Sequence, residues 1–200
     1  LERRGARIGM IVTRGFRDVL ELRRRDRPRT WRLWGEYLPV VPRDLVYGRA
    51  RKGGVIVFLH ASGARDQYLH LVIVLAAHRV KSIGAIWFEG EMAVSAGGTA
   101  QGRWADRITL EKRLGASDQT AFSALAAELP DKWTPDHRLA GCAAIHLRLT
   151  YDADAFPGGI PNITVDLEGK DDILDPRTGL RGYSENPALC LADYMAHPDL

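Results

Sequence analysis

The sequence lacks any apolar run long enough to cross a membrane as a helix. Its longest apolar run, "LVIVLAA", is far shorter than the roughly 18 residues that a membrane helix needs. The first residues, "LERRGARIGMIVTRG", are charged where a secretory signal would be apolar. We therefore expect no membrane insertion and no signal peptide. Because the first residue is leucine, we expect the chain to be an excerpt of a longer one.

Cysteine is scarce. The two cysteines, Cys142 and Cys190, lie 48 positions apart in apolar surroundings, and neither belongs to a CxxC pair. This spacing argues against a zinc site. Two buried thiols are the favoured interpretation, and a disulfide between them is the alternative.

The short motifs of catalysis and cofactor binding are also missing. The sequence contains no GxSxG, no GxGxxG, and no phosphate-binding loop ending in Gly-Lys-Ser or Gly-Lys-Thr. The glycine-rich "AGGTAQG" follows an expected hairpin strand and precedes no evident helix, so it predicts a flexible loop. We therefore expect no enzyme and no cofactor.

The six histidines raise the question of a metal site. His70 and His78 would share one face of a strand, but about 26 Å apart, because a strand rises about 3.3 Å per residue. One ion cannot span that distance. Only a fold that brings in His60, His137 or His146 could form a site, and no HxH or HExxH motif occurs. We expect no bound metal.

Acidic residues gather at three places: Glu89 with Glu91, Asp152 with Asp154, and Asp171, Asp172 and Asp175. General acid–base catalysis by carboxylates needs two of them to face one cleft. Sequence alone does not show whether any of these pairs does so. The last two groups lie among glycine, proline and tyrosine, which favours a role in loops and turns. "DLEGKDDILD" lacks the ligand spacing of a calcium loop. We predict no catalytic, cofactor-binding or metal-binding residue.

Net positive charge is confined to the first quarter of the chain. Residues 1–45 hold 12 arginines, no lysine and 6 acidic residues, whereas the remainder holds 16 basic and 19 acidic residues. Arg23, Arg24 and Arg25, with Trp31 and Trp34 for stacking, could contact nucleic acid. A solvated helix end is the favoured interpretation, because the acidic remainder offers no second basic surface.

Residues 7–13, "RIGMIVT", read as a buried strand followed by a helix that Pro28 ends. From Val46 the pattern becomes strand-dominated. The expected strands lie in "GGVIVFLH", "YLHLVIVLAAH", "GAIWFEGEMAV", "RITLEKRLG", "AAIHLRLTYD" and "NITVDLEG". In the second, Tyr68, His70, Val72, Val74, Ala76 and His78 would share one face, and Leu69, Leu71, Ile73 and Leu75 the other. Glu89-Gly90 would form the turn of a hairpin.

Two helices interrupt these strands. Ser117 could cap the first, whose apolar face would be Phe122, Leu125, Ala126 and Leu129, and Pro130 would end it. Asn186 would cap the second, with Pro187 at its first position. Its apolar stripe would be Leu191, Tyr194 and Met195. The predicted fold class is α+β, strand-dominated, with two short helices after an N-terminal strand, turn and helix.

Residues 1–45 resemble part of the N-terminal region of hydantoinase A and the related 5-oxoprolinase and acetophenone carboxylase subunits. "TRGFRDVLE" and "RRRDRP" carry the resemblance. It implies an actin-like ATPase fold acting on cyclic amides, with Arg14 and Arg17 at matching positions of unassigned role. The family's DxGGTFTD-like phosphate loop does not occur in this sequence.

From about Pro42 the chain resembles phage tail proteins of the tip attachment protein J type, also called host-specificity proteins. The matching segments are "RDLVYGRARKGGVIVFLH", "YLHLVIVLAAHRVKSIGAIWFEGE", "LRLTYDADAFPGGIPNITVDLEGK", "DPRTG" and "SENPALCLADY". The resemblance implies a β-rich tail hub, encoded by a phage or prophage. This hub would form a homotrimer and assemble with other tail proteins. Further domains would follow it and contact a host surface receptor. "GCAAIHLRLTYD" departs from the aromatic-rich versions that are common in the family.

The two resemblances meet in "PRDL", so we expect a chimera with two domains, at residues 1–41 and 42–200. The expected function is that of a structural component of a phage tail tip, located in the virion tail after assembly in the host cytoplasm. We expect no catalysis and no small-molecule substrate. The alternative is a fragment of an ATP-dependent enzyme of the hydantoinase and 5-oxoprolinase type.

Overall fold

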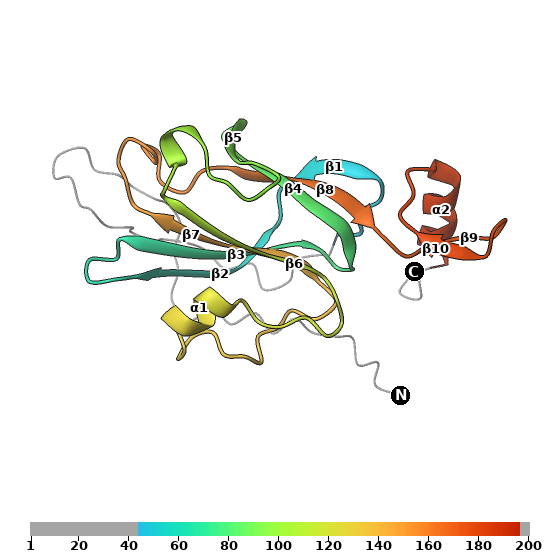
Figure 1. Cartoon of the computed structure of the whole chain (residues 1–200), viewed down its shortest axis with the longest axis horizontal. Helices are drawn as coiled ribbons and strands as arrows, with labels where there is room; N and C mark the ends of the chain where they lie inside the picture. The colour runs from blue at the N-terminus through green and yellow to red at the C-terminus, as the bar shows by residue number, and fades with distance from the viewer. Residues whose placement is uncertain (1–43, 197–200) are drawn as a thin grey trace.

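The computed structural model describes residues 44–196, which form two four-stranded antiparallel sheets packed face to face (Figure 1). Sheet A has the order β1-β8-β4-β5 and sheet B the order β2-β3-β7-β6. The strands of sheet A are β1 (Arg49–Lys52), β8 (Ile163–Lys170), β4 (Val80–Phe88) and β5 (Glu91–Val94). Those of sheet B are β2 (Val55–Ser62), β3 (Tyr68–Ala76), β7 (Ala143–Thr150) and β6 (Ile108–Leu114).

The main core lies between the two sheets and follows the two-residue period of the strands. Alternate residues of β3 and β7, among them Leu71 and Leu147, are fully buried there against Ile86, Phe88 and Val165 of sheet A. The predicted alternation on β3 is thus confirmed over residues 69–75. It is wrong for Ala76, which joins this core because the register shifts after Val74, and for His78, which lies beyond the end of β3.

The predicted hairpin is confirmed. Strands β4 and β5 pair antiparallel on either side of Glu89 and Gly90, both of which have positive φ (50° and 84°). Two consecutive residues with positive φ match the right-handed twist of the flanking strands. After β5, a turn and the short 3-10 helix η1 (Gly102–Trp104) lead to β6.

Helix α1 (Ser123–Glu128) lies on the outer face of sheet B, away from sheet A (Figure 1). Phe122 and Leu125 are buried against Phe58 and Val72, as the predicted apolar face requires. The prediction that Ser117 caps this helix is wrong. The N-cap residue is Phe122, which has no side chain able to accept a hydrogen bond, and Ser117 is exposed.

The chain ends, within the described part, in a hairpin of β9 (Ile173–Asp175) and β10 (Leu180–Gly182) followed by helix α2 (Pro187–Met195). In Figure 1 this hairpin and helix stand apart from the two sheets. Asn186 caps α2 as predicted, since its side chain accepts a hydrogen bond from Ala188 N at 3.0 Å. Tyr47 and Lys170 anchor α2 by donating to Asp193 Oδ2, each at 2.7 Å.

The predicted fold class is confirmed, because strands dominate the described residues and the sheets are antiparallel. Neither cysteine forms a disulfide; Cys142 is buried as expected, but Cys190 is partly exposed. Within residues 44–196 no helix is long and apolar enough to span a membrane. The strand, turn and helix expected for residues 1–41, and the arginine cluster, lie outside the described residues.

Candidate functional site

Two imidazoles form a fully buried pair beneath helix α1. His70 on β3 and His146 on β7 point from the outer face of sheet B, and neither side chain is exposed. Their rings are almost parallel, with an interplanar angle of 4°, and His70 Nδ1 lies 3.1 Å from His146 Nε2. The strand register explains the contact. His146 lies opposite Val72, two residues along β3 from His70, so the two histidines are diagonal neighbours on one face.

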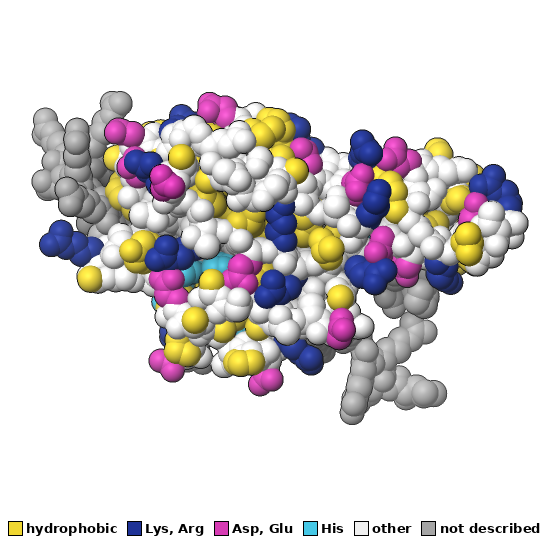
Figure 2. Space-filling view, viewed as in Figure 1, with side chains coloured by type: hydrophobic (Ala, Val, Ile, Leu, Met, Phe, Trp, Pro, Cys, Tyr) yellow, Lys and Arg dark blue, Asp and Glu magenta, His cyan; other side chains and the backbone are white. Residues whose placement is uncertain are grey.

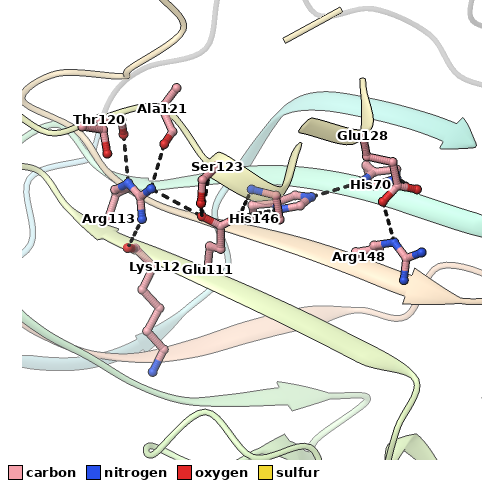
Figure 3. A network of polar contacts seen from close by, with 11 residues as sticks. His70, Glu111, Lys112, Arg113, Thr120, Ala121, Ser123, Glu128, His146 and Arg148 are labelled. Carbon is pink, nitrogen blue, oxygen red and sulfur yellow. Dashed lines mark hydrogen bonds and ion pairs between the residues drawn. The ribbon is translucent and has the colours of Figure 1, made fainter. Parts of the chain in front are cut away.

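A carboxylate stands at each end of this pair (Figure 3). At one end, Glu128 Oε1 lies 3.2 Å from His70 Nε2 and accepts a hydrogen bond from Ser62 Oγ at 2.8 Å. Its other oxygen accepts from Arg148 Nε at 2.8 Å. At the other end, Glu111 Oε1 lies 3.8 Å from His146 Nδ1, too far for a hydrogen bond.

Glu111 also supplies the cap that the sequence of α1 does not. From strand β6, its carboxylate accepts from Ser123 N at 3.0 Å, from Ser123 Oγ at 3.1 Å and from Ala124 N at 2.7 Å. These amides belong to the first turn, where backbone donors have no partner within the helix. Arg113 Nη2 lies 3.4 Å from the same carboxylate and donates to Ala121 O at 2.7 Å. Glu111 and Arg113 thus fix the start of α1 to sheet B.

The hydrogen bonds determine where the protons lie when both imidazoles are neutral. Because Ser62 donates its only proton to ionised Glu128, His70 Nε2 must carry a proton and donate to Glu128 and Ser62, which lies 2.9 Å away. His70 Nδ1 then accepts from His146 Nε2. This leaves His146 Nδ1 as a buried nitrogen without a hydrogen-bond partner, beside Glu111.

Burial sets the ionisation of the imidazoles, and hydrogen bonds set that of the carboxylates. The pKa of His146 is lowered to about 4, chiefly by desolvation and then by the neighbouring His70. Desolvation likewise lowers the pKa of His70. For Glu111 and Glu128 the largest effect, burial, raises the pKa, but hydrogen bonds and neighbouring positive charge outweigh it, and both pKa values are lowered. At neutral pH the network therefore has neutral imidazoles between ionised carboxylates.

This arrangement does not suit nucleophilic catalysis. In a Ser-His-acid triad the serine and the acid contact opposite nitrogens of the imidazole. Here Ser62 and Glu128 both contact His70 Nε2, and Ser62 donates to the carboxylate. Because both imidazoles are wholly buried, a substrate has no route to them in this conformation. The geometry fits a structural network that ties α1 to the sheet.

The histidines considered as metal ligands are only partly brought together. His70 and His146 meet, whereas His78 Nε2 accepts from Val46 N at 2.8 Å and His137 Nδ1 accepts from Thr134 N at 2.8 Å. His60 lies on β2, with its ring next to Phe58. In the part of the chain that the structure describes, no group of three or more His, Cys, Asp or Glu residues could hold a metal ion.

The acidic groups singled out from the sequence lie in turns and ion pairs. Asp152 Oδ1 accepts from Asp154 N and Ala155 N, and its other oxygen pairs with Arg107 at 2.8 Å. "DLEGKDDILD" forms the end of β8 and all of β9, so it is no calcium loop. "AGGTAQG" forms the turn after β5, where Ser95 N donates to Thr99 O.

Glu111 and Glu128 were not singled out from the sequence. Neither belongs to a carboxylate pair, and each reaches the histidines from another element of the fold. The alternation of β6 would have placed Glu111 on a defined strand face. Only the pairing of Glu111 with His146 across β6 and β7 brings the two together.

No protein-family model matches the sequence, and no curated protein matches it. Among solved structures, the chain is similar to a chain described as "Virion of native gene transfer agent (GTA) particle". The sequence identity is 19% and the TM-score is 0.47; the match covers 70% of this chain and 31% of that one. A likeness at this level establishes neither family nor function.

Proposed function

We propose that residues 42–200 are a structural, non-catalytic part of a phage tail tip, of the tip attachment protein J type. The domain assembles with other tail proteins and, in its full-length context, as a homotrimer. In the full-length protein, further domains then contact the host surface receptor. We further propose that residues 1–41 are a separate piece of the hydantoinase A type.

The segments that carry the tail-protein resemblance support the proposal because they are neighbours in space. They contribute β1, β3, β4, β8, most of β2 and half of β7, which pair with one another within the two sheets. The remaining two segments form the β9–β10 turn and helix α2. The resemblance therefore covers one packed unit rather than scattered surface pieces.

The observation that carries the proposal is the uncovered apolar surface of the C-terminal hairpin and helix. None of the nine residues of α2 is buried. Leu191, Tyr194 and Met195, the predicted stripe, are 58%, 43% and 73% exposed, and Leu180 of β10 is 71% exposed. Figure 2 shows hydrophobic side chains among charged ones at this end of the molecule.

A helix this short is not stable in water without packing. Large apolar side chains that share one exposed face are typical of a surface that another subunit covers. An assembly of tail subunits supplies such a cover. The buried histidine network fits this function too, since it ties α1 to sheet B without offering a reactive surface.

Replacing both Leu191 and Met195 with aspartate tests the proposal. We expect the wild-type chain to self-associate with rising concentration, and the double variant to associate at least about tenfold more weakly, because charge at the contact must be desolvated. Multi-angle light scattering over a concentration series measures both. Leu114→Asp is the matched control, since Leu114 is 42% exposed at the end of β6, on sheet B. Equal loss in this control, or a wild type that stays monomeric, would contradict the proposal.

A further inference from the structure

Helix α1 and its flanking loops form a separate layer on sheet B. Residues 115–142 join β6 to β7 and contain no strand. Their buried side chains Phe122, Leu125 and Trp133 pack on Phe58, Val72, Val74 and Ala144, in a cluster distinct from the core between the sheets. The two sheets could therefore keep their common core if this layer were released.

The buried imidazoles and both attachments of α1 belong to one network (Figure 3). Glu111 holds the first turn of the helix and faces His146. Glu128 is the last helical residue and contacts His70, Ser62 and Arg148. The charge state of the pair therefore acts on both ends of α1.

We propose that α1 with residues 115–142 is an acid-sensitive latch: proton uptake by the His70–His146 pair releases this layer from sheet B while the two sheets stay folded. This inference does not depend on the proposed function.

Charged groups face the pair from every element packed against it. The four nearest are Glu111 and Arg113 on β6, Glu128 on α1 and Arg148 on β7. Farther away are His60 on β2 and, beside His60, Lys132 in the loop after α1. Each carboxylate already has a guanidinium partner, so the four nearest charges sum to zero. An added imidazolium would be an uncompensated buried charge, which is costly. A second proton would place two such charges in contact.

The sign of the pH dependence follows from the lowered affinity of the closed state for protons. In the closed state His146 has a pKa of about 4, and in the open state it would return to its ordinary value of 6.5. Acid therefore favours the open state between these two values. This shift favours opening about 30-fold at about pH 5 relative to pH 8. His70, whose pKa is also lowered, adds in the same direction.

The test is hydrogen exchange by mass spectrometry on the whole chain, at about pH 5 and pH 8, corrected for intrinsic rates. We expect residues 115–142 to exchange at least about tenfold faster in acid, while β3, β7 and β8 stay protected. Cys142, the last residue of the layer and buried between it and sheet B, gives a second readout. In a Cys190→Ser background its rate of reaction with dithiodipyridine, divided by that of a free thiol at the same pH, should be higher in acid.

His146→Gln removes the larger of the two titrations but keeps a polar side chain, and should make both readouts clearly less dependent on pH than in the wild type. His60→Gln, on the same sheet but outside the pair, is the matched control and should behave like the wild type. The latch is refuted if wild-type residues 115–142 stay as protected at about pH 5 as β3 and β7, or open only together with them. It is also refuted if His146→Gln opens as the wild type does. The wild-type result stands even if His146→Gln fails to fold.

Discussion

Gly169→Ala is expected to destabilise the fold by about 3 kcal/mol, because β8 has no room for a methyl group at this position. A Cβ there would overlap the carbonyl group of Val46 and lie 3.0 Å from Tyr47 Cα. The clash is with backbone, which cannot rotate away as a side chain can. The methyl group would displace residues 46–48 from β8. In this segment Gly48 O and Val46 O accept hydrogen bonds from Gly169 N and Lys170 N, each at 2.8 Å. Urea denaturation monitored by circular dichroism measures the loss.

Gly182→Ala is the matched control for this experiment. Gly182 also lies in a strand, β10, but a Cβ there would have no neighbour within 4 Å, and its φ is not positive. Such a substitution changes stability by less than about 1 kcal/mol, and it can be stabilising because it restricts the unfolded chain. Equal effects of the two substitutions would show that residues 46–48 do not pack closely on β8.

Glu111→Ala is expected to cost about 3 kcal/mol and to loosen α1. The side chain is only 16% exposed and holds Ser123 N, Ser123 Oγ and Ala124 N, while facing His146. Removing it leaves two helix amides without their acceptor and takes from Arg113 its carboxylate partner, although Arg113 keeps its hydrogen bonds to Thr120 O and Ala121 O. Urea denaturation gives the free energy of unfolding, and hydrogen exchange of residues 123–128 shows whether the helix opens.

Two further variants separate the contributions of Glu111. Glu111→Gln keeps one acceptor oxygen and should lose less stability than Glu111→Ala. Glu91→Ala removes a carboxylate that is 65% exposed and paired with Arg103 at 3.4 Å, so its effect should stay within about 1 kcal/mol. If Glu91→Ala costs as much as Glu111→Ala, the capping role assigned to Glu111 is wrong.

The strands were largely predictable because burial imposes the two-residue period on the sequence. On β7, Ile145 and Leu147 face the core and His146 faces the other side, as their alternation predicts. Helix α2 was predictable from local chemistry, since Asn186 and Pro187 supply the cap and the first position. In both cases the signal lies within the element itself.

The start of α1 and the histidine network depend on contacts between distant residues. Ser117 was a reasonable cap on local grounds, but the first turn is capped from β6 by Glu111. His70 and His146 lie 76 positions apart and meet only because of the register between β3 and β7. A single sequence does not fix that register. The exposure of Leu191 and Met195 likewise could not be predicted without knowing how α2 packs.

The most direct test of the account is hydrogen exchange of helix α2 at two protein concentrations. If copies of this chain cover its apolar face, amides of residues 187–195 should exchange more slowly in concentrated than in dilute protein, while those of β3 and β7 do not change. Exchange of α2 that is fast and identical at both concentrations, in a protein of monomeric mass, would contradict the claim that this surface is built for assembly.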